Sequence, residues 1–333
     1  MIGVYRRTLR RYNSRLIVTQ LDVRHGGIDS CFRALLTDLR NHLRPPRPGT
    51  PMLNYRETLD GAMIGGNPAR VAAVETHYAT SAERSIPLRL YRPIVNAALQ
   101  PAIFFLHGGG FVIGSLDSHD ELCRELAVRS GAIVVAVGYS LAPETIFPGA
   151  YEDCCAALAW LVVGSRDLGV DPSRLAICGD SAGGNLAVGT ACWAREQGIS
   201  FRHIGLIYPA LDPSCASASA HEFGSGFILT REFTQWFWSA YLGEGGDPLD
   251  PRVAVATADL AGLPPISLAT AEYDPLRDEG EDFARAARAA GVEVIARRYL
   301  GMIHGFASMP RMTPMAGRAI ADLAADIARS LAV

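Results

Sequence analysis

Short apolar runs alternate with longer amphipathic stretches over most of the chain, and this pattern predicts the order of strands and helices. Between residues 71 and 93 apolar and polar side chains alternate, which predicts two antiparallel strands opening a sheet. Farther along, short and mostly apolar runs predict strands buried on both faces. The expected buried strands cover residues 102–106, 132–137, 175–178, 204–208 and 266–270, and an alternating run at 294–300 follows them.

Stretches with apolar side chains at helical spacing separate these expected strands. Such an alternation over residues 102–331 predicts a mostly parallel sheet with helices on both faces, which is the α/β class. Residues 118–121 read Ser-His-Asp-Glu, a capping-box pattern that predicts a helix start, with His119 expected on the surface or at a rim. Further helices are expected over residues 149–163, 181–198 and 278–291, around 233–241, and in a closing segment around 320–327.

The buried run at 175–178 ends in a glycine-flanked serine, Gly179-Asp180-Ser181-Ala182-Gly183, and small residues at helical spacing follow. On a tight strand-to-helix turn, side chains two residues either side of the serine would clash, and the turn exposes the serine hydroxyl above the sheet. The motif alone is a modest signal, because chance matches occur. In this context it predicts a nucleophile.

Three further stretches follow expected strands and give the motif its weight. His107 and the glycines at 108–110 form a loop of the type that donates backbone amides to an oxyanion. Asp274 follows one later strand, and His304 follows the next. The chain order serine, acid, histidine is that of the α/β-hydrolase fold. We therefore interpret Ser181, Asp274 and His304 as a catalytic triad.

Several stretches together match the motifs of one known family. They are His107-Gly108-Gly109-Gly110-Phe111, Tyr139 with Leu141-Ala142-Pro143-Glu144, Gly179-Asp180-Ser181-Ala182-Gly183-Gly184, Asp274-Pro275-Leu276-Arg277-Asp278-Glu279 and His304-Gly305-Phe306. On these residues the chain resembles the hormone-sensitive-lipase-like family of α/β-hydrolases, in its branch of bacterial acetyl esterases and small carboxylesterases. The likeness runs roughly from residue 31 to the C-terminus. It departs at Ser140, where the family usually has arginine, so a structural contact is expected to be lost there.

The resemblance implies an α/β-hydrolase fold, with a mostly parallel central sheet flanked by helices and a helical cap. Residues 1–27 precede the likeness and are expected to be an extension, either a poorly ordered tail or the product of an upstream start codon. Residues 28–66 are expected to form the N-terminal part of the cap. Residues 67–333 are expected to form the catalytic domain, with a cap insertion at about 212–250.

Each site residue has an expected role. Ser181 attacks the substrate, His304 is its general base, and Asp274 orients the imidazole. Asp278 and Glu279 remain rival acids, but Asp274 is preferred because it directly follows a strand and matches the family position. The expected oxyanion donors are the amides of Gly108, Gly109 and Ala182. The loop and the turn are expected to be supported by His107, Gly110 and Asp180. The substrate pocket is expected to be lined by Phe111, Trp236 and Phe237.

Composition narrows the classes of function. Among 333 residues, 49% are hydrophobic and 20% charged, with a net charge of −3, so nucleic acid is not an expected partner. No apolar run approaches the length of a membrane span. The seven cysteines form no Cys-x-x-Cys pair and most lie in apolar patterns, which favours buried thiols and a cytoplasmic location. No metal or cofactor is expected, because the remaining histidines lack ligand spacing.

The leading hypothesis is a serine carboxylesterase that hydrolyses small, short-acyl esters with water as the second substrate. An amide or formamide hydrolase on the same triad is the alternative enzyme, since acyl-serine chemistry does not choose the leaving group. A ligand-binding protein that kept the fold without catalysis is a third interpretation, weakened by the complete context of His304. The resemblance also implies a monomer or a homodimer, the latter pairing through residues 294–300.

Overall fold

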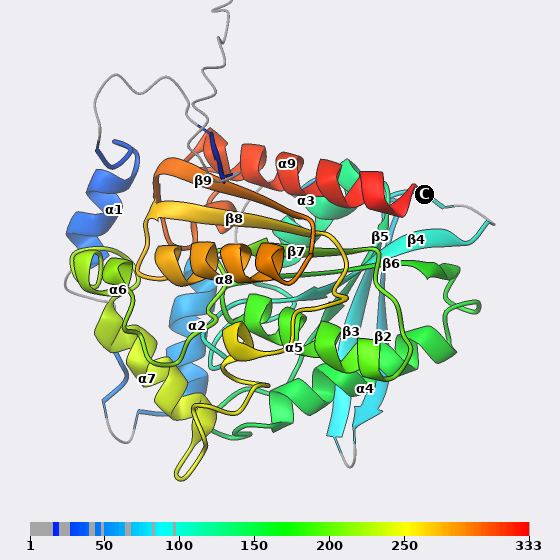
Figure 1. Cartoon of the computed structure of the whole chain (residues 1–333), viewed down its shortest axis with the longest axis horizontal. Helices are drawn as coiled ribbons and strands as arrows, with labels where there is room; N and C mark the ends of the chain where they lie inside the picture. Colours follow the sequence, from blue (N-terminus) through cyan, green and yellow to red (C-terminus); the bar gives the residue numbers. More distant parts are fainter. Residues whose placement is uncertain are drawn as a thin grey trace, which may run out of the picture.

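A single twisted sheet runs through the molecule (Figure 1). The computed structural model describes residues 16–19, 27–39, 44–47, 50–63, 68–81, 84–95 and 98–332. Within these ranges nine strands pair in the order β1-β9-β8-β7-β6-β4-β5-β3-β2. Strand β3 runs antiparallel to β2 and β5, and every other pair is parallel. The strands are β1 (Leu16–Thr19), β2 (Ala73–Ser81), β3 (Arg84–Arg92), β4 (Gln100–Leu106), β5 (Ile133–Val137), β6 (Val170–Asp180), β7 (His203–Ile207), β8 (Ile266–Tyr273) and β9 (Val294–Ile303).

Helices cover both faces of the sheet, which confirms the predicted α/β class. Helices α4, α5 and α8 cover one face and α3 and α9 the other, while α1, α2, α6 and α7 gather at one end (Figure 1). The helices are α1 (Phe32–Leu39), α2 (Met52–Met63), α3 (Asp120–Ser130), α4 (Gly149–Val163), α5 (Ala182–Glu196), α6 (Ala218–Glu222), α7 (Arg231–Leu242), α8 (Arg277–Ala289) and α9 (Pro314–Leu331), with 3₁₀ turns at Val255–Thr257 and Phe306–Ser308.

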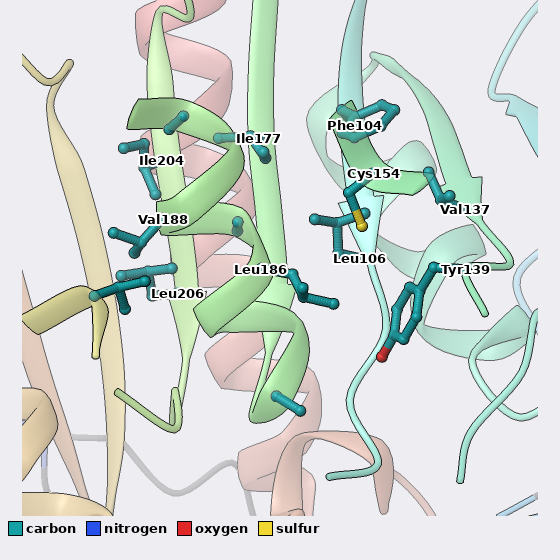
Figure 2. Packing of buried hydrophobic residues seen from close by; sticks show 14 of the residues in the cluster. Phe104, Leu106, Val137, Tyr139, Cys154, Ile177, Leu186, Val188, Ile204 and Leu206 are labelled. Carbon is teal, nitrogen blue, oxygen red and sulfur yellow. The ribbon is translucent and has the colours of Figure 1, made fainter. Parts of the chain in front are cut away.

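Burial on both faces explains why the central strands are continuously apolar. Along β4, Phe104 belongs to the core beneath α4 and α5, while its neighbour Phe105 belongs to the core beneath α3 and α9. Leu186 and Val188 of α5 lie over Leu206 and the adjacent strands of the first core (Figure 2). Because successive strand residues face opposite ways, a strand covered on both sides requires apolar residues at every position.

The start of α3 differs from the sequence prediction. The helix begins at Asp120 with His119 at the N-cap, and no side chain caps its first amides. The Ser118 hydroxyl instead donates to the Ser115 carbonyl oxygen and accepts from the Ser115 amide. His119 is 1% exposed and faces inward. The capping box and the surface position of His119 were therefore wrong, because Ser118 bonds to Ser115 in the preceding turn and His119 packs against Asp180 in the interior.

A buried carboxylate holds the loop that contains Ser140, where the family usually has arginine. Asp153 of α4 is fully buried and accepts from the Ser140 amide at 3.0 Å. The Arg84 side chain of β3 donates to the same carboxylate at 3.0 Å. A buried carboxylate is strongly destabilising unless it is paired. Arg84, at the start of β3, supplies the guanidinium that neutralises this charge.

Strand β1 covers the side of β9 that faces away from β8. Leu16 pairs with Ala296 and Thr19 with Tyr299 in a parallel register. The other residues of the predicted extension, 1–15 and 20–26, lie outside the described residues. Because β9 is paired on both sides, a homodimer formed through residues 294–300 would require β1 to leave its place.

Removal of residues 1–26 is expected to leave the kcat/KM of the ester hydrolysis predicted from the sequence within about threefold of the value for the full chain. Strand β1 contributes backbone pairing at the outer edge of the sheet, and changes far from a site usually act independently of it. The measurement is ester hydrolysis by both proteins, with the truncated chain checked for native circular dichroism. A correctly folded truncation that lost most of its activity would show instead that the extension shapes the site.

Candidate active site

Ser181 lies on a strained turn between β6 and α5. Its φ of 51° and ψ of −119° are unfavourable for a residue with a Cβ, and such strain is typical of functional positions. The flanking glycines are required by close backbone contacts. A Cβ at Gly179 would lie 2.2 Å from the Gly183 carbonyl oxygen, and one at Gly183 would lie 2.0 Å from that of Leu106. The turn therefore holds the serine hydroxyl at the N-terminus of α5.

The three predicted triad side chains form one hydrogen-bonded relay. His304 Nε2 is 3.0 Å from Ser181 Oγ, and His304 Nδ1 is 2.8 Å from Asp274 Oδ2. Asp274 is fully buried, and its other oxygen accepts from the Leu276 amide at 2.9 Å. The carboxylate places the imidazole proton on Nδ1, so Nε2 is free to accept the serine proton.

The rival acids have other partners. Glu279 is buried, and its carboxyl accepts from the Leu211 amide at 2.7 Å. Burial raises the pKa of Glu279 well above its usual range. Asp278 accepts from the Ser219 amide at 2.8 Å and pairs with Arg277. Among the three acids considered from the sequence, the structure brings Asp274 alone to the histidine.

The glycine loop after β4 differs from the prediction in one respect. The Gly108 amide donates to Asp180 Oδ1 at 2.8 Å, so it is not a free oxyanion donor. A Cβ at Gly108 would lie 2.4 Å from the other oxygen of that carboxylate. The amides of Gly109 and Gly110 have no acceptor among the described residues, and both glycines have positive φ. The prediction for Gly108 is therefore corrected, and Gly110 takes its place as a free donor.

His107 and Tyr139 hold the loop from beneath. His107 Nδ1–H donates to the Gly108 carbonyl oxygen at 2.8 Å. Burial, with His119 nearby, lowers the pKa of His107 to about 3, so the ring is neutral. Tyr139 stacks on that ring at 4.2 Å and donates its hydroxyl to the His107 carbonyl oxygen at 2.6 Å.

Helix α2 binds the loop from the outside, a contact that the sequence analysis missed. Arg56 Nε donates to the Val112 carbonyl oxygen at 2.7 Å, and the same guanidinium reaches the Ala142 carbonyl oxygen at 2.8 Å. Asp60 accepts from the Gly114 amide at 2.9 Å. The signal available in the sequence was the spacing of Arg56 and Asp60, which places two opposite charges on one helix face.

The three aromatic residues predicted for the substrate pocket lie in different places. Phe111 is buried with a φ of 64° and stacks on Tyr241 at 3.9 Å, so it belongs to the core and its assignment to the pocket is corrected. Phe237 packs on the glycine loop, because a Cβ at Gly110 would lie 2.2 Å from its ring. Trp236 is partly exposed on α7, where the predicted cap insertion lies.

The described ranges contain neither a cluster of metal-ligating side chains nor a helix suited to a bilayer. No group of three or more histidine, cysteine, aspartate or glutamate side chains there is arranged to hold a metal ion. None of the helices in the described ranges has the length and apolar character needed to span a bilayer. All seven cysteines lie in these ranges and are free thiols.

Comparison with known proteins places this geometry among hydrolases. A family model described as alpha/beta hydrolase fold matches residues 103–308. An ethyl acetate hydrolase of Pseudomonas putida is 41% identical over 230 residues, covering 68% of this chain and 72% of that protein. A carboxylesterase of Mycobacterium tuberculosis is 38% identical over 251 residues, covering 74% of this chain and 79% of the relative. The solved structure of a hyperthermophilic esterase from Pyrobaculum calidifontis superposes with a TM-score of 0.85 at 38% identity, covering 91% of this chain and 98% of that one.

Proposed function

The chain belongs to the hormone-sensitive-lipase-like family of α/β-hydrolases, and we propose that it is a serine carboxylesterase acting on small esters. The observation that carries the proposal is the relay of Ser181, His304 and Asp274, with contacts of 3.0 and 2.8 Å. A serine hydroxyl is a weak nucleophile near pH 7 and needs a base within hydrogen-bond reach. This relay meets that requirement at a strained turn.

In the proposed reaction, His304 Nε2 takes the proton of Ser181 as Oγ attacks the ester carbonyl carbon. The tetrahedral intermediate collapses, the alcohol leaves with that proton, and an acyl-serine remains. Water then loses a proton to His304 and attacks the acyl group, which releases the carboxylic acid and restores the serine. Asp274 stabilises the imidazolium in both halves of the reaction.

We assign the oxyanion donors to the amides of Gly109, Gly110 and Ala182. The first two lack an acceptor among the described residues, and Ala182 is the first residue of α5, where an amide has no intrahelical partner. The positive end of the α5 dipole adds to their field. Loss of one such donor typically costs about 10² to 10³ in kcat.

A short acyl group is the second part of the proposal. One relative is named an ethyl acetate hydrolase, and the ring of Phe237 packs directly on Gly110 beside the proposed oxyanion donors. A bulky ring at that position favours small acyl groups over long chains. Each methylene that a pocket accommodates or excludes is worth about 10- to 200-fold in specificity.

The experiment is turnover of p-nitrophenyl esters from acetate to palmitate. The expected result is a maximum of kcat/KM at two to four acyl carbons, with a decline of about tenfold or more by ten carbons. A maximum at long chains would contradict the small acyl site. If no ester reacted while a fluorophosphonate still labelled Ser181, the relay would serve another leaving group, and amides and formamides would be measured next.

We also propose that the enzyme works in the cytoplasm. The support is the set of seven cysteines, which are free thiols in the structure. Thiols persist in reducing compartments and tend to be oxidised outside them. Cells that express the chain without an added N-terminal tag are fractionated, and an esterase assay of each fraction tests this location.

A further inference from the structure

A buried carboxylate joins the nucleophile turn to the glycine loop. Asp180 ends β6, directly before Ser181, and it is 4% exposed. One of its oxygens accepts from the Gly108 amide at 2.8 Å. The same carboxylate therefore contacts the segment that carries the nucleophile and the segment that carries two of the proposed oxyanion donors, so its position influences the distance between them.

His119 is the ion-pair partner of this carboxylate within the described residues. Its Nε2 lies 3.4 Å from both oxygens of Asp180. A buried carboxylate without a partner is strongly destabilised and tends to take up a proton. The neighbouring His107 does not supply the compensating charge, because its buried ring is neutral.

The surroundings of His119 favour a ring with protons on both nitrogens. The Ser118 hydroxyl donates its proton to the Ser115 carbonyl oxygen, so its oxygen accepts a hydrogen bond from His119 Nδ1–H at 2.9 Å. Burial alone lowers the pKa of His119, but the charges of Asp180 and Asp60 outweigh it and raise the pKa. The charged and titratable groups that face the ring are thus Asp180, Asp60 and His107.

We propose that His119 is a positioning residue for ester hydrolysis, acting through Asp180 to hold the Gly108 amide and with it the oxyanion loop. Without the Nε2–H donor, the carboxylate loses its partner and turns or takes up a proton, and its hold on Gly108 weakens. The amides of Gly109 and Gly110 then shift relative to Ser181 Oγ. Because oxyanion donors act mainly in the transition state, the loss appears in kcat with little change in KM.

The inference rests on the proposed function but is tested by a probe that needs no turnover. A trifluoromethyl ketone forms a tetrahedral adduct with a reactive serine, and its oxyanion occupies the oxyanion hole. Its Ki therefore reports the position of the loop whichever leaving group the enzyme prefers. Kinetics of p-nitrophenyl acetate hydrolysis are measured beside it, with active enzyme counted by fluorophosphonate titration.

Two substitutions separate the two nitrogens of the ring. In His119→Gln the side-chain amide lies near the position of Nε2 and can donate to Asp180. In His119→Asn the shorter amide lies near Nδ1 and reaches Ser118 only. We expect His119→Asn to lower kcat about 100-fold and to raise the Ki of the ketone by a similar factor, with a change in KM of less than about threefold. For His119→Gln we expect kcat and Ki to stay within about tenfold of the wild-type values.

His203→Asn and His203→Gln are the matched controls. His203 is also a buried histidine with both nitrogens bonded, to Ser267 and Ser330, but it lies at the start of β7. These variants are expected to lose stability without changing kcat or Ki per titrated site. Equal Ki values for His119→Asn and wild type, or equal losses in the Asn and Gln variants of His119, would overturn the inference. Absence of ester turnover with the expected Ki pattern would overturn the proposed function alone.

Discussion

Replacement of Ser181 by alanine is expected to lower kcat for p-nitrophenyl acetate by about 10⁶-fold while leaving the fold intact. The hydroxyl is the only group removed, and His304 Nε2 contacts its oxygen at 3.0 Å. Alanine also carries a Cβ, so the backbone strain of a positive φ at this position stays the same. The measurement is the rate per folded molecule, together with the free energy of unfolding, which is expected to change by less than about 1 kcal/mol.

Ser173→Ala provides the control for this experiment. Ser173 lies on the same strand as the nucleophile turn, near its start, where its hydroxyl bonds to Asp171 at the surface. The activity of the Ser173→Ala variant is expected to equal that of wild type. Retention of most activity by Ser181→Ala, or stoichiometric fluorophosphonate labelling of that variant, would show that another residue is the nucleophile.

Replacement of Asp274 by asparagine is expected to lower kcat by about 10⁴-fold at pH 7. The fully buried carboxylate accepts the His304 Nδ1 proton at 2.8 Å. An amide at this position offers an N–H to Nδ1 and so favours the other tautomer, in which Nε2 carries the proton. That imidazole has no lone pair at Nε2 to accept the proton of Ser181, although the distances are nearly unchanged.

Asp278→Asn is the matched control, since Asp278 was a rival acid in the same segment. Its carboxylate accepts from the Ser219 amide and pairs with Arg277 at the surface of α8. An asparagine keeps one acceptor for that amide, so the activity per folded molecule is expected to stay within about tenfold of wild type. A larger loss in Asp278→Asn than in Asp274→Asn would reverse the assignment of the acid.

The elements of the fold were largely predictable from periodicity. Apolar runs at 132–137 and 204–208 correspond to β5 and β7, because strands covered on both faces need apolar side chains at every position. The start of α3 was not predictable in this way. Ser118 and Glu121 fit a capping pattern locally, but Ser118 bonds to Ser115 instead, and His119 has a partner 61 residues away along the chain.

The sequence by itself determined the order of the motifs and the local shape of the nucleophile turn. The order of the motifs is given directly by the chain. The shape of the turn depends on contacts within a few residues, such as the clash that a Cβ at Gly179 would make with Gly183. The same local signals predicted that a serine, an acid and a histidine follow strands whose ends meet at one edge of the sheet. Within the triad, only the choice among three nearby acids remained open.

The tertiary structure alone decided which groups of the site are occupied and which are free. Whether Gly108 or Gly110 offers its amide depends on Asp180, which lies 72 residues from Gly108 in the sequence. The role of His119 depends on the same carboxylate. The physical reason is that a buried charge takes its partners from whatever packing brings close to it, and periodicity and propensity describe only a residue's neighbours along the chain.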